Sequence, residues 1–210
     1  MGQCFFCQGI QTVSANNPLL QSHDLPPFSQ IRAEHVLPAI EAILADNRKA
    51  IAEILEKQGK NPTWAGLVLA MDELNDRLGA AWSPVSHLNA VCNSAELREA
   101  YESCLPALSA YSTELGQNRA LFEAYQALIN SPEAAGFDVA QKTILEHALR
   151  DFRLSGIDLP ADKQQRYAEV QSKLSELGSR FSNQLLDATQ AWTKHCLLYT
   201  SDAADDLLCV

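Results

Sequence analysis

The 210-residue sequence has little positive charge and few cysteines. It contains 16 Lys and Arg residues against 26 Asp and Glu residues, so its formal net charge is −10. Binding to nucleic acid or to an anionic membrane needs a basic surface that neutralises phosphates, and this composition argues against both partners. Six cysteines are too few for a disulfide scaffold in a chain of this length. We therefore expect reduced thiols and a cytoplasmic protein.

Long hydrophobic runs are also absent. No stretch approaches the run of about 18 apolar residues that a membrane-spanning helix requires. Residues 1–10 contain no Lys or Arg, and Gln3, Gln8 and Gly9 interrupt their apolar run, so they make a poor secretory signal. The hydrophobic content of 47% with 20% charged residues excludes a disordered chain. These features predict a soluble globular protein.

No catalytic histidine motif occurs in the sequence. A His-Glu-x-x-His segment would place two zinc ligands on one face of a helix, but Glu34-His35 and Glu146-His147 each lack the second histidine. We interpret both as ordinary helix residues, and we interpret His87 as structural rather than catalytic. The five histidines are His23, His35, His87, His147 and His195.

The cysteines do not indicate a redox or zinc site either. Cys4 and Cys7 have the spacing of a redox or zinc half-site, but no βαβ unit and no second cysteine pair follow them. We interpret Cys92 and Cys104 as small buried hydrophobic residues. No glycine-rich phosphate loop and no nucleophile turn are found either. The sequence therefore provides no catalytic, cofactor-binding or metal-binding residue.

What the sequence does contain is apolar residues at helical spacing, with no sustained alternation of period two between residues 33 and 192. The fold class expected is all-α, with long antiparallel helices. Gly79 and Pro84 should break or bend the second helix, and Pro106 and Gly116 should kink the third. The predicted helical segments run from Ala33 to Gly59, from Trp64 to Val91, from Ser94 to Leu128, from Asp138 to Gly156 and from Pro160 to Trp192.

Local signals support these helix boundaries. Thr63 and Ser94 are candidate N-caps, Asp138 with Gln141 forms a capping box, and Pro160 suits the first position of the last helix. That last helix would span about 45 Å at 1.5 Å per residue, which is long for a small bundle. Two classes stay open: a non-catalytic part of a larger enzyme, or a free-standing interaction module. The module would use the apolar seam of Tyr167, Val170, Leu174, Leu177 and Phe181.

Several segments occur in an order and spacing that resemble a known family. Examples are Asn17-Pro18-Leu19-Leu20, residues 82–89 (Trp-Ser-Pro-Val-Ser-His-Leu-Asn) and residues 148–152 (Ala-Leu-Arg-Asp-Phe). The sequence resembles the N-terminal region of the thimet-oligopeptidase-like zinc metallopeptidases from about Val13 to His195. The other matching segments are residues 25–28, 33–36, 93–94, 97–101, 154–157, 159–160, 163–167, 174–178, 187–189 and 192–194.

The resemblance implies a helical N-terminal region that forms one wall of a deep channel. That channel would admit short unfolded peptides and exclude folded proteins. The family's zinc ligands and general-base glutamate belong to a His-Glu-x-x-His helix far toward the C-terminus of a much longer chain. No residue here matches that motif, so no catalytic or zinc residue is carried over. The resemblance thus implies zinc and oligopeptide substrates for the longer protein, a missing C-terminal catalytic domain, and no hydrolysis by this chain alone.

Both ends depart from the family pattern. We expect residues 1–12 to be a non-native leader, with Val13 as the natural initiator, and residues 13–195 to be the family-like region. Residues 196–210 begin with Cys-Leu-Leu-Tyr-Thr-Ser-Asp-Ala-Ala-Asp, which matches the translation of a transposase-type sequencing adapter. This interpretation predicts that the final segment is not native.

Overall fold

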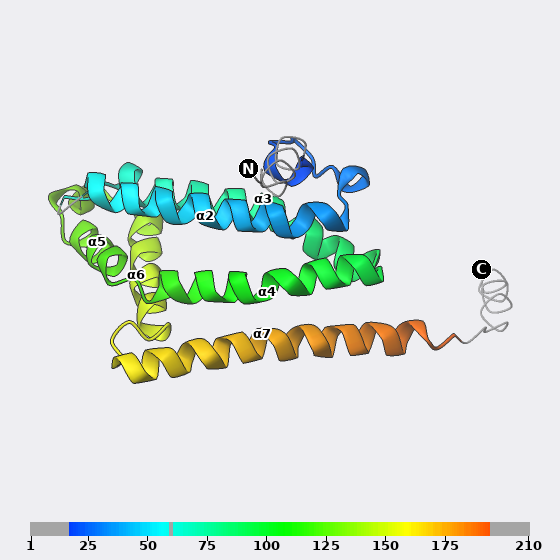
Figure 1. The fold of residues 1–210 in the computed structure, drawn as a ribbon. Coiled ribbons are helices and arrows are strands. Elements are labelled where there is room, and N and C mark those ends of the chain that lie inside the picture. Colours follow the sequence, from blue (N-terminus) through cyan, green and yellow to red (C-terminus); the bar gives the residue numbers. More distant parts are fainter. Residues whose placement is uncertain (1–16, 59–60, 194–210) are drawn as a thin grey trace, which may run out of the picture. The chain divides into compact units, whose positions relative to one another are not determined.

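The structure is a computed structural model that describes residues 17–58 and 61–193 (Figure 1). Within these residues every regular element is helical, which confirms the all-α prediction. The expected non-native segments, 1–12 and 196–210, lie outside the described residues. The elements are η1 (Pro18–Leu20), η2 (Phe28–Gln30), α2 (Ala33–Gln58), η3 (Trp64–Leu69), α3 (Ala70–Val91), α4 (Ala95–Gly116), α5 (Arg119–Ile129), η4 (Pro132–Gly136), α6 (Val139–Leu154) and α7 (Ala161–Gln190).

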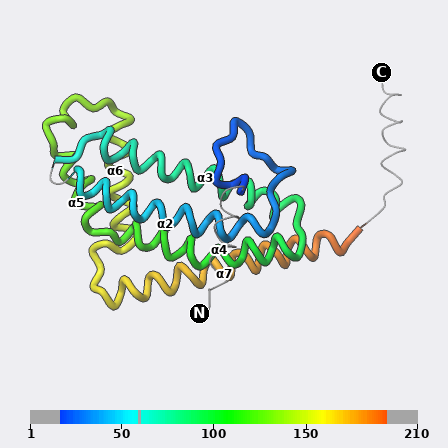
Figure 2. The backbone as a smooth tube through the Cα atoms, turned by 45° about the horizontal axis from the view of Figure 1, so that its top comes forward, coloured from blue at the N-terminus to red at the C-terminus, as the bar shows by residue number. Residues whose placement is uncertain are grey.

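The first three long helices form the centre of the fold. α2 packs against both α3 and α4, and Figures 1 and 2 show α3 running antiparallel to α2 and to α4. An apolar stripe on α2 faces this core, and burial of each large side chain contributes about 1.5–3 kcal/mol. The buried apolar residues of the stripe are Val36, Ala39, Ile40, Ile43, Leu44 and Ile51.

α3 is continuous through both residues expected to interrupt it. The Thr63 side chain accepts a hydrogen bond from the Gly66 N–H, as predicted for an N-cap, and a π-helical turn leads into α3. Gly79 and Pro84 both lie inside the helix, so neither residue breaks it, and the alternative of a bend stays a prediction. Pro84 and Val85 are buried, and α3 packs against α2, α4 and η1, which stabilises the helix although Pro84 lacks a backbone N–H to donate.

The third predicted segment is two helices rather than one kinked helix. α4 passes through Pro106 and ends at Gly116, and α5 starts after Asn118. The Asn118 side chain accepts from the Leu121 N–H at 3.0 Å, which makes it the N-cap of α5. Ser94 caps α4 in the same way through the Leu97 N–H, as predicted. The chain therefore separates at a capping residue and not at the proline.

α6 has the predicted signals at both ends. Asp138 and Gln141 form the capping box. At the other end Gly156 has φ +87°, its N–H donates to the Arg153 carbonyl, and the Ile157 N–H donates to the Phe152 carbonyl. This pair of bonds is a Schellman motif, which favours glycine because the left-handed conformation strains other residues.

α7 is the 30-residue helix that the sequence predicts. It begins at Ala161, and the Pro160 carbonyl accepts from the N–H groups of Lys163 and Gln164. The sequence predicts Pro160 as the first residue of the helix, but the helix begins one residue later, so Pro160 is the residue just before it. Contacts divide the chain into two compact units, one ending at Glu176 and one starting at Leu177, so α7 contributes to both. No helix in residues 17–58 and 61–193 has the length and hydropathy to cross a membrane.

Candidate functional site

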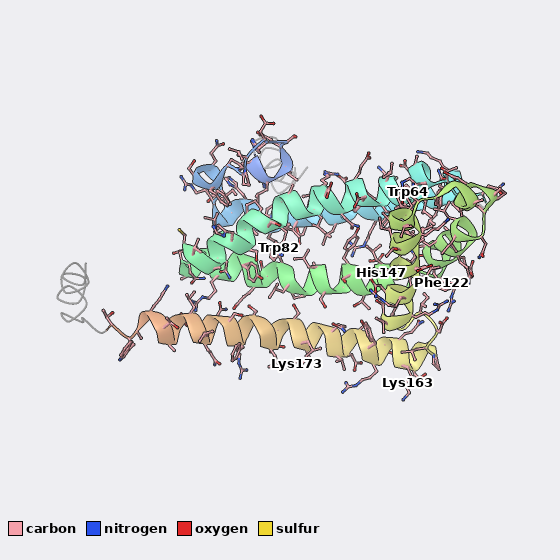
Figure 3. All side chains as sticks on the ribbon, turned by 180° about the vertical axis from the view of Figure 1, so that it is seen from behind. Trp64, Trp82, Phe122, His147, Lys163 and Lys173 are labelled. Atoms are coloured by element: carbon pink, nitrogen blue, oxygen red, sulfur yellow. The ribbon has the colours of Figure 1, made fainter. Side chains whose placement is uncertain are left out.

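The histidines singled out in the sequence lie on separate elements. The Nδ1 atom of His35 accepts from the Arg32 N–H at 3.1 Å, which ties the ring to the start of α2. The ring of His87, on α3, packs against Phe28 with 5.5 Å between centroids. His147 is exposed on α6 (Figure 3). Across the part of the chain that the structure describes, no group of three or more His, Cys, Asp or Glu side chains could hold a metal ion.

The two described cysteines differ in environment. Cys104 is fully buried, as predicted, and its thiol donates to the Ala100 carbonyl at 3.3 Å. Burial raises the pKa of the Cys104 thiol to about 11, so the side chain stays a neutral thiol at physiological pH. Cys92 is exposed, so the prediction that it is buried is wrong. Cys92 is the C-cap residue of α3, where the helix leaves the core. Cys4 and Cys7 lie outside the described residues.

A cavity lies between residues 18–28 and α3, and we call it the strap groove. Its volume is about 790 Å³. Figure 2 shows the N-terminal segment, in blue, beside α3. The segment lining it contains Pro18, Pro26 and Pro27, and proline favours extended and turn conformations over a continuous helix. The remaining lining residues are Leu19, Leu20, Gln21, Ser22, His23, Asp24, Phe28, Asp76, Arg77, Gly79, Ala80, Ser83, Pro84 and His87.

The strap groove combines an apolar base with charged groups. Pro18, Leu19 and Pro84 are buried, whereas Asp24 and Asp76 are exposed. Sequence reasoning missed this groove. The sequence features that relate to the groove are the prolines of residues 18–28 and the small residues at helical spacing on α3. Nothing in the sequence alone shows that these two segments lie side by side.

A smaller cavity of about 280 Å³ lies between α4 and the first half of α7. It is lined almost entirely by hydroxyl and amide groups, so it has neither a charged group nor a nucleophile–base pair. The residues are Ser109, Ser112, Thr113, Ser155, Tyr167, Gln171 and Ser175.

The corner between α6 and α7 is held by polar side chains. The Gln117 Nε2 donates to the Ser155 carbonyl and the Gln164 Nε2 donates to the Gly156 carbonyl, both at 3.1 Å. Arg119 pairs with Asp158 at 3.4 Å. These contacts satisfy carbonyls beyond the end of α6, which fixes the start of α7.

The unit that starts at Leu177 presents large apolar side chains to solvent. The exposed fractions are 43% for Leu177, 67% for Phe181, 58% for Leu185 and 70% for Trp192. Asn183, a polar residue on the same helix, is buried. Spacings of four residues place Leu177, Phe181 and Leu185 along one side of α7, so that these apolar side chains form a continuous exposed surface.

The helical fold and its sequence match a known protein family. A sequence model described as Neurolysin/Thimet oligopeptidase, N-terminal domain, matches residues 40–164. The chain belongs to this family, as the resemblance in the sequence indicated.

Among its relatives, Oligopeptidase A of Haemophilus influenzae is 54% identical over 182 residues, which are 87% of this chain and 26% of that protein. Oligopeptidase A of Escherichia coli is 52% identical over 178 residues, 85% of this chain and 26% of that protein. The Probable cytosolic oligopeptidase A of Arabidopsis thaliana is 36% identical over 86% of this chain and 25% of that protein. The chain thus spans about a quarter of the length of the curated relatives it matches.

Proposed function

We propose that this chain is the N-terminal helical region of a cytoplasmic zinc metalloendopeptidase of the oligopeptidase A type, which hydrolyses short oligopeptides. The observation that carries the proposal is the identity of 54% and 52% to two proteins named Oligopeptidase A over most of this chain. The acidic composition and the plant relative's name, which includes the word cytosolic, support the location.

The residues that the structure describes do not fit a zinc site. The described histidines lie on different elements, His35 binds backbone, and no described group of side chains has the ligand set that zinc needs. The zinc and the general-base glutamate are therefore assigned to the part of the longer protein that follows. The role left to this region is to form a wall of the substrate channel, which restricts the size of the peptides that enter.

The exposed face of α7 supports this division of roles. In the unit that starts at Leu177, the large apolar residues Phe181 and Leu185 are exposed, whereas the polar Asn183 is buried. An apolar face of this kind needs a partner to remove it from water. We assign that partner to the remaining three-quarters of the longer protein, because the relatives continue well beyond the length matched here.

The proposal is tested with the purified 210-residue chain and a quenched fluorescent peptide. We expect no chelator-sensitive cleavage by this chain, and a His-Glu-x-x-His segment when the reading frame is extended in the source DNA. Zinc-dependent turnover by the chain alone would contradict the assignment of the catalytic residues to a later segment. A genuine stop codon after Val210 would contradict the existence of the longer protein.

The exposed α7 residues also favour a second function, that of a free-standing interaction module without catalytic activity. The predicted seam includes Val170 and Leu174, which are 40% and 57% exposed, and it continues through Leu177 and Phe181. The same extension of the reading frame separates the two functions, because a module has no downstream zinc motif.

A further inference from the structure

We propose that the strap groove binds a short extended peptide carrying a Lys or Arg side chain next to apolar residues. This inference goes beyond the proposed function, because it concerns a binding site formed by this chain itself. It is measured as peptide binding without hydrolysis, so its failure is distinguishable from failure of the proposed function.

The dimensions of the groove suit a peptide of this kind. Its volume of about 790 Å³ lies in the range of about 300–1,000 Å³ that is common for ligand sites. The lining residues of α3 extend from Asp76 to His87, a distance of about 16 Å along a helix axis. An extended chain advances about 3.3–3.6 Å per residue, so the groove accommodates about five residues.

Small residues keep the α3 side of the groove open. Gly79, Ala80 and Ser83 lie at helical spacing on the lining face. A Cβ atom added to Gly79 would meet no other atom within 4 Å, so space is free directly above the helix backbone. A larger side chain at Gly79 would therefore enter the groove without displacing protein atoms at its Cβ position.

The base of the groove favours apolar groups of the ligand. Pro18, Leu19 and Pro84 are buried there, and the ring of Phe28 packs against His87 at the groove wall. The His23 Nε2 donates to the Pro18 carbonyl at 3.1 Å, which holds the imidazole ring beside this buried proline. Apolar side chains of a bound peptide would lose their contact with water on this surface.

The charge of the groove selects a cation. Asp24 and Asp76 line it, and neither forms an ion pair within residues 17–58 and 61–193. The basic side chain at the groove, Arg77, is held by Asp46 at 2.9 Å on the exposed surface. The net charge of −10 on the whole chain adds an attractive field for a cationic ligand. An acidic peptide would meet two unpaired carboxylates instead.

The experiment measures calorimetric binding of the peptide acetyl-Ala-Leu-Lys-Leu-Ala-amide to the 210-residue chain at low salt. We expect saturable binding, and binding at least about tenfold weaker when Glu replaces the Lys of the peptide. Spermidine supplies positive charge without apolar side chains, so it should also bind at least about tenfold more weakly. Equal affinity for the Lys and Glu peptides, or for spermidine and the Lys peptide, would overturn the proposed ligand class.

Two groove variants locate the site. Gly79→Trp fills the open space and should weaken binding by at least about tenfold. The double variant Asp24→Asn with Asp76→Asn should weaken it about fivefold, since each exposed charge pair contributes little alone. Far-ultraviolet circular dichroism checks folding, and the double variant decides the result if Gly79→Trp is unfolded.

Matched controls make the same kinds of substitution, glycine to tryptophan and carboxylate to amide, outside the groove. Gly178→Trp places the same side chain on α7, where a Cβ atom also meets nothing within 4 Å. Glu56→Gln with Glu146→Gln removes two exposed carboxylates from α2 and α6. Both controls should bind the Lys peptide as the unmodified chain does. Unchanged binding in the folded groove variants, or equal weakening in the controls, would overturn the placement of the site.

Discussion

α2 and α7 have the same kind of sequence pattern but opposite surroundings. Both helices have apolar residues three and four positions apart, and both form long helices. In α2, Ile40 and Ile43 have exposed fractions of 0% and 1%, whereas Phe181 and Leu185 of α7 have 67% and 58%. The spacing of apolar residues therefore determines which side of a helix is apolar. That side is buried only where a neighbouring element packs against it.

The neighbours of the two helices account for the difference. α2 lies between α3 and α4, which remove its apolar stripe from water. In the part of α7 that starts at Leu177, the buried residue is Asn183, and Ser179 and Leu186 are half-buried. Among the described residues, the large apolar side chains Leu177, Phe181 and Leu185 of α7 are therefore exposed, unlike those of the α2 stripe.

A pair of equivalent substitutions tests this comparison with the largest expected effect. Leu44→Ala, at 1% exposure in α2, should lower the free energy of unfolding by about 2–5 kcal/mol because it removes packing and leaves a cavity. Leu185→Ala, at 58% exposure in α7, should change it by no more than about 0.5 kcal/mol. Chemical denaturation measures both. A similar loss from the two variants would mean that Leu185 is buried in solution.

A glycine just after the end of α6 and one in the middle of α7 offer the next test. Gly156→Ala should lower the free energy of unfolding by about 1–2 kcal/mol, because the residue has φ +87° and its Cβ would lie 2.9 Å from Leu159 Cδ1. Gly178→Ala should raise it by about 0.5–1 kcal/mol, because alanine favours a helix and nothing lies near the new Cβ. Thermal unfolding gives the sign of each change. Stabilisation by Gly156→Ala would contradict the Schellman motif.

The cap between α4 and α5 tests whether the packed region depends on local signals as well as on its core. Asn118→Ala should lower the free energy of unfolding by about 1 kcal/mol, because the Leu121 N–H loses its side-chain acceptor. The exposed α7 residue Gln184 serves as a control, and Gln184→Ala should have an effect within about 0.5 kcal/mol. Denaturant titration compares the two. Equal effects would argue that the break after Gly116 does not need the cap.

Ion pairs give the smallest expected difference between α2 and α7 in the free energy of unfolding. Arg48 on α2 pairs with Glu114 on α4 at 2.8 Å and lies over the Tyr111 ring, while Lys173 pairs with Glu176 within α7. Arg48→Met should lower the free energy of unfolding by about 0.5–1 kcal/mol. Lys173→Met should lower it by less than about 0.5 kcal/mol, since its pair is exposed and local. Measurements at low and high salt check that the losses are electrostatic.

Much of the fold could be predicted from local residues. Asp138 with Gln141, Ser94 and Gly156 each act through atoms a few positions away, so their sequence context determines the outcome. The continuity of α3 through Pro84 could not be predicted in this way, because packing against α2 decides it.

The site was harder to predict than the fold. The strap groove depends on contacts between residues 18–28 and α3, which lie far apart in the sequence. Cys92 is exposed only because it follows the last turn of α3, whereas Cys104 lies on the inner side of α4. The uncovered face of α7 also could not be recognised from its sequence, since the same spacing is buried in α2.

The most direct test of the account is the alkylation rate of a cysteine at position 181 in two proteins. One is this chain with Phe181→Cys and its natural cysteines replaced, and the other is a chimera in which residues 17–193 of that variant replace the matching segment of Escherichia coli oligopeptidase A. Peptide hydrolysis by the chimera shows that it is folded. The account predicts rapid alkylation in this chain and a rate at least about tenfold lower in the active chimera, because the following polypeptide covers the face. Equal rates in the two proteins would contradict it.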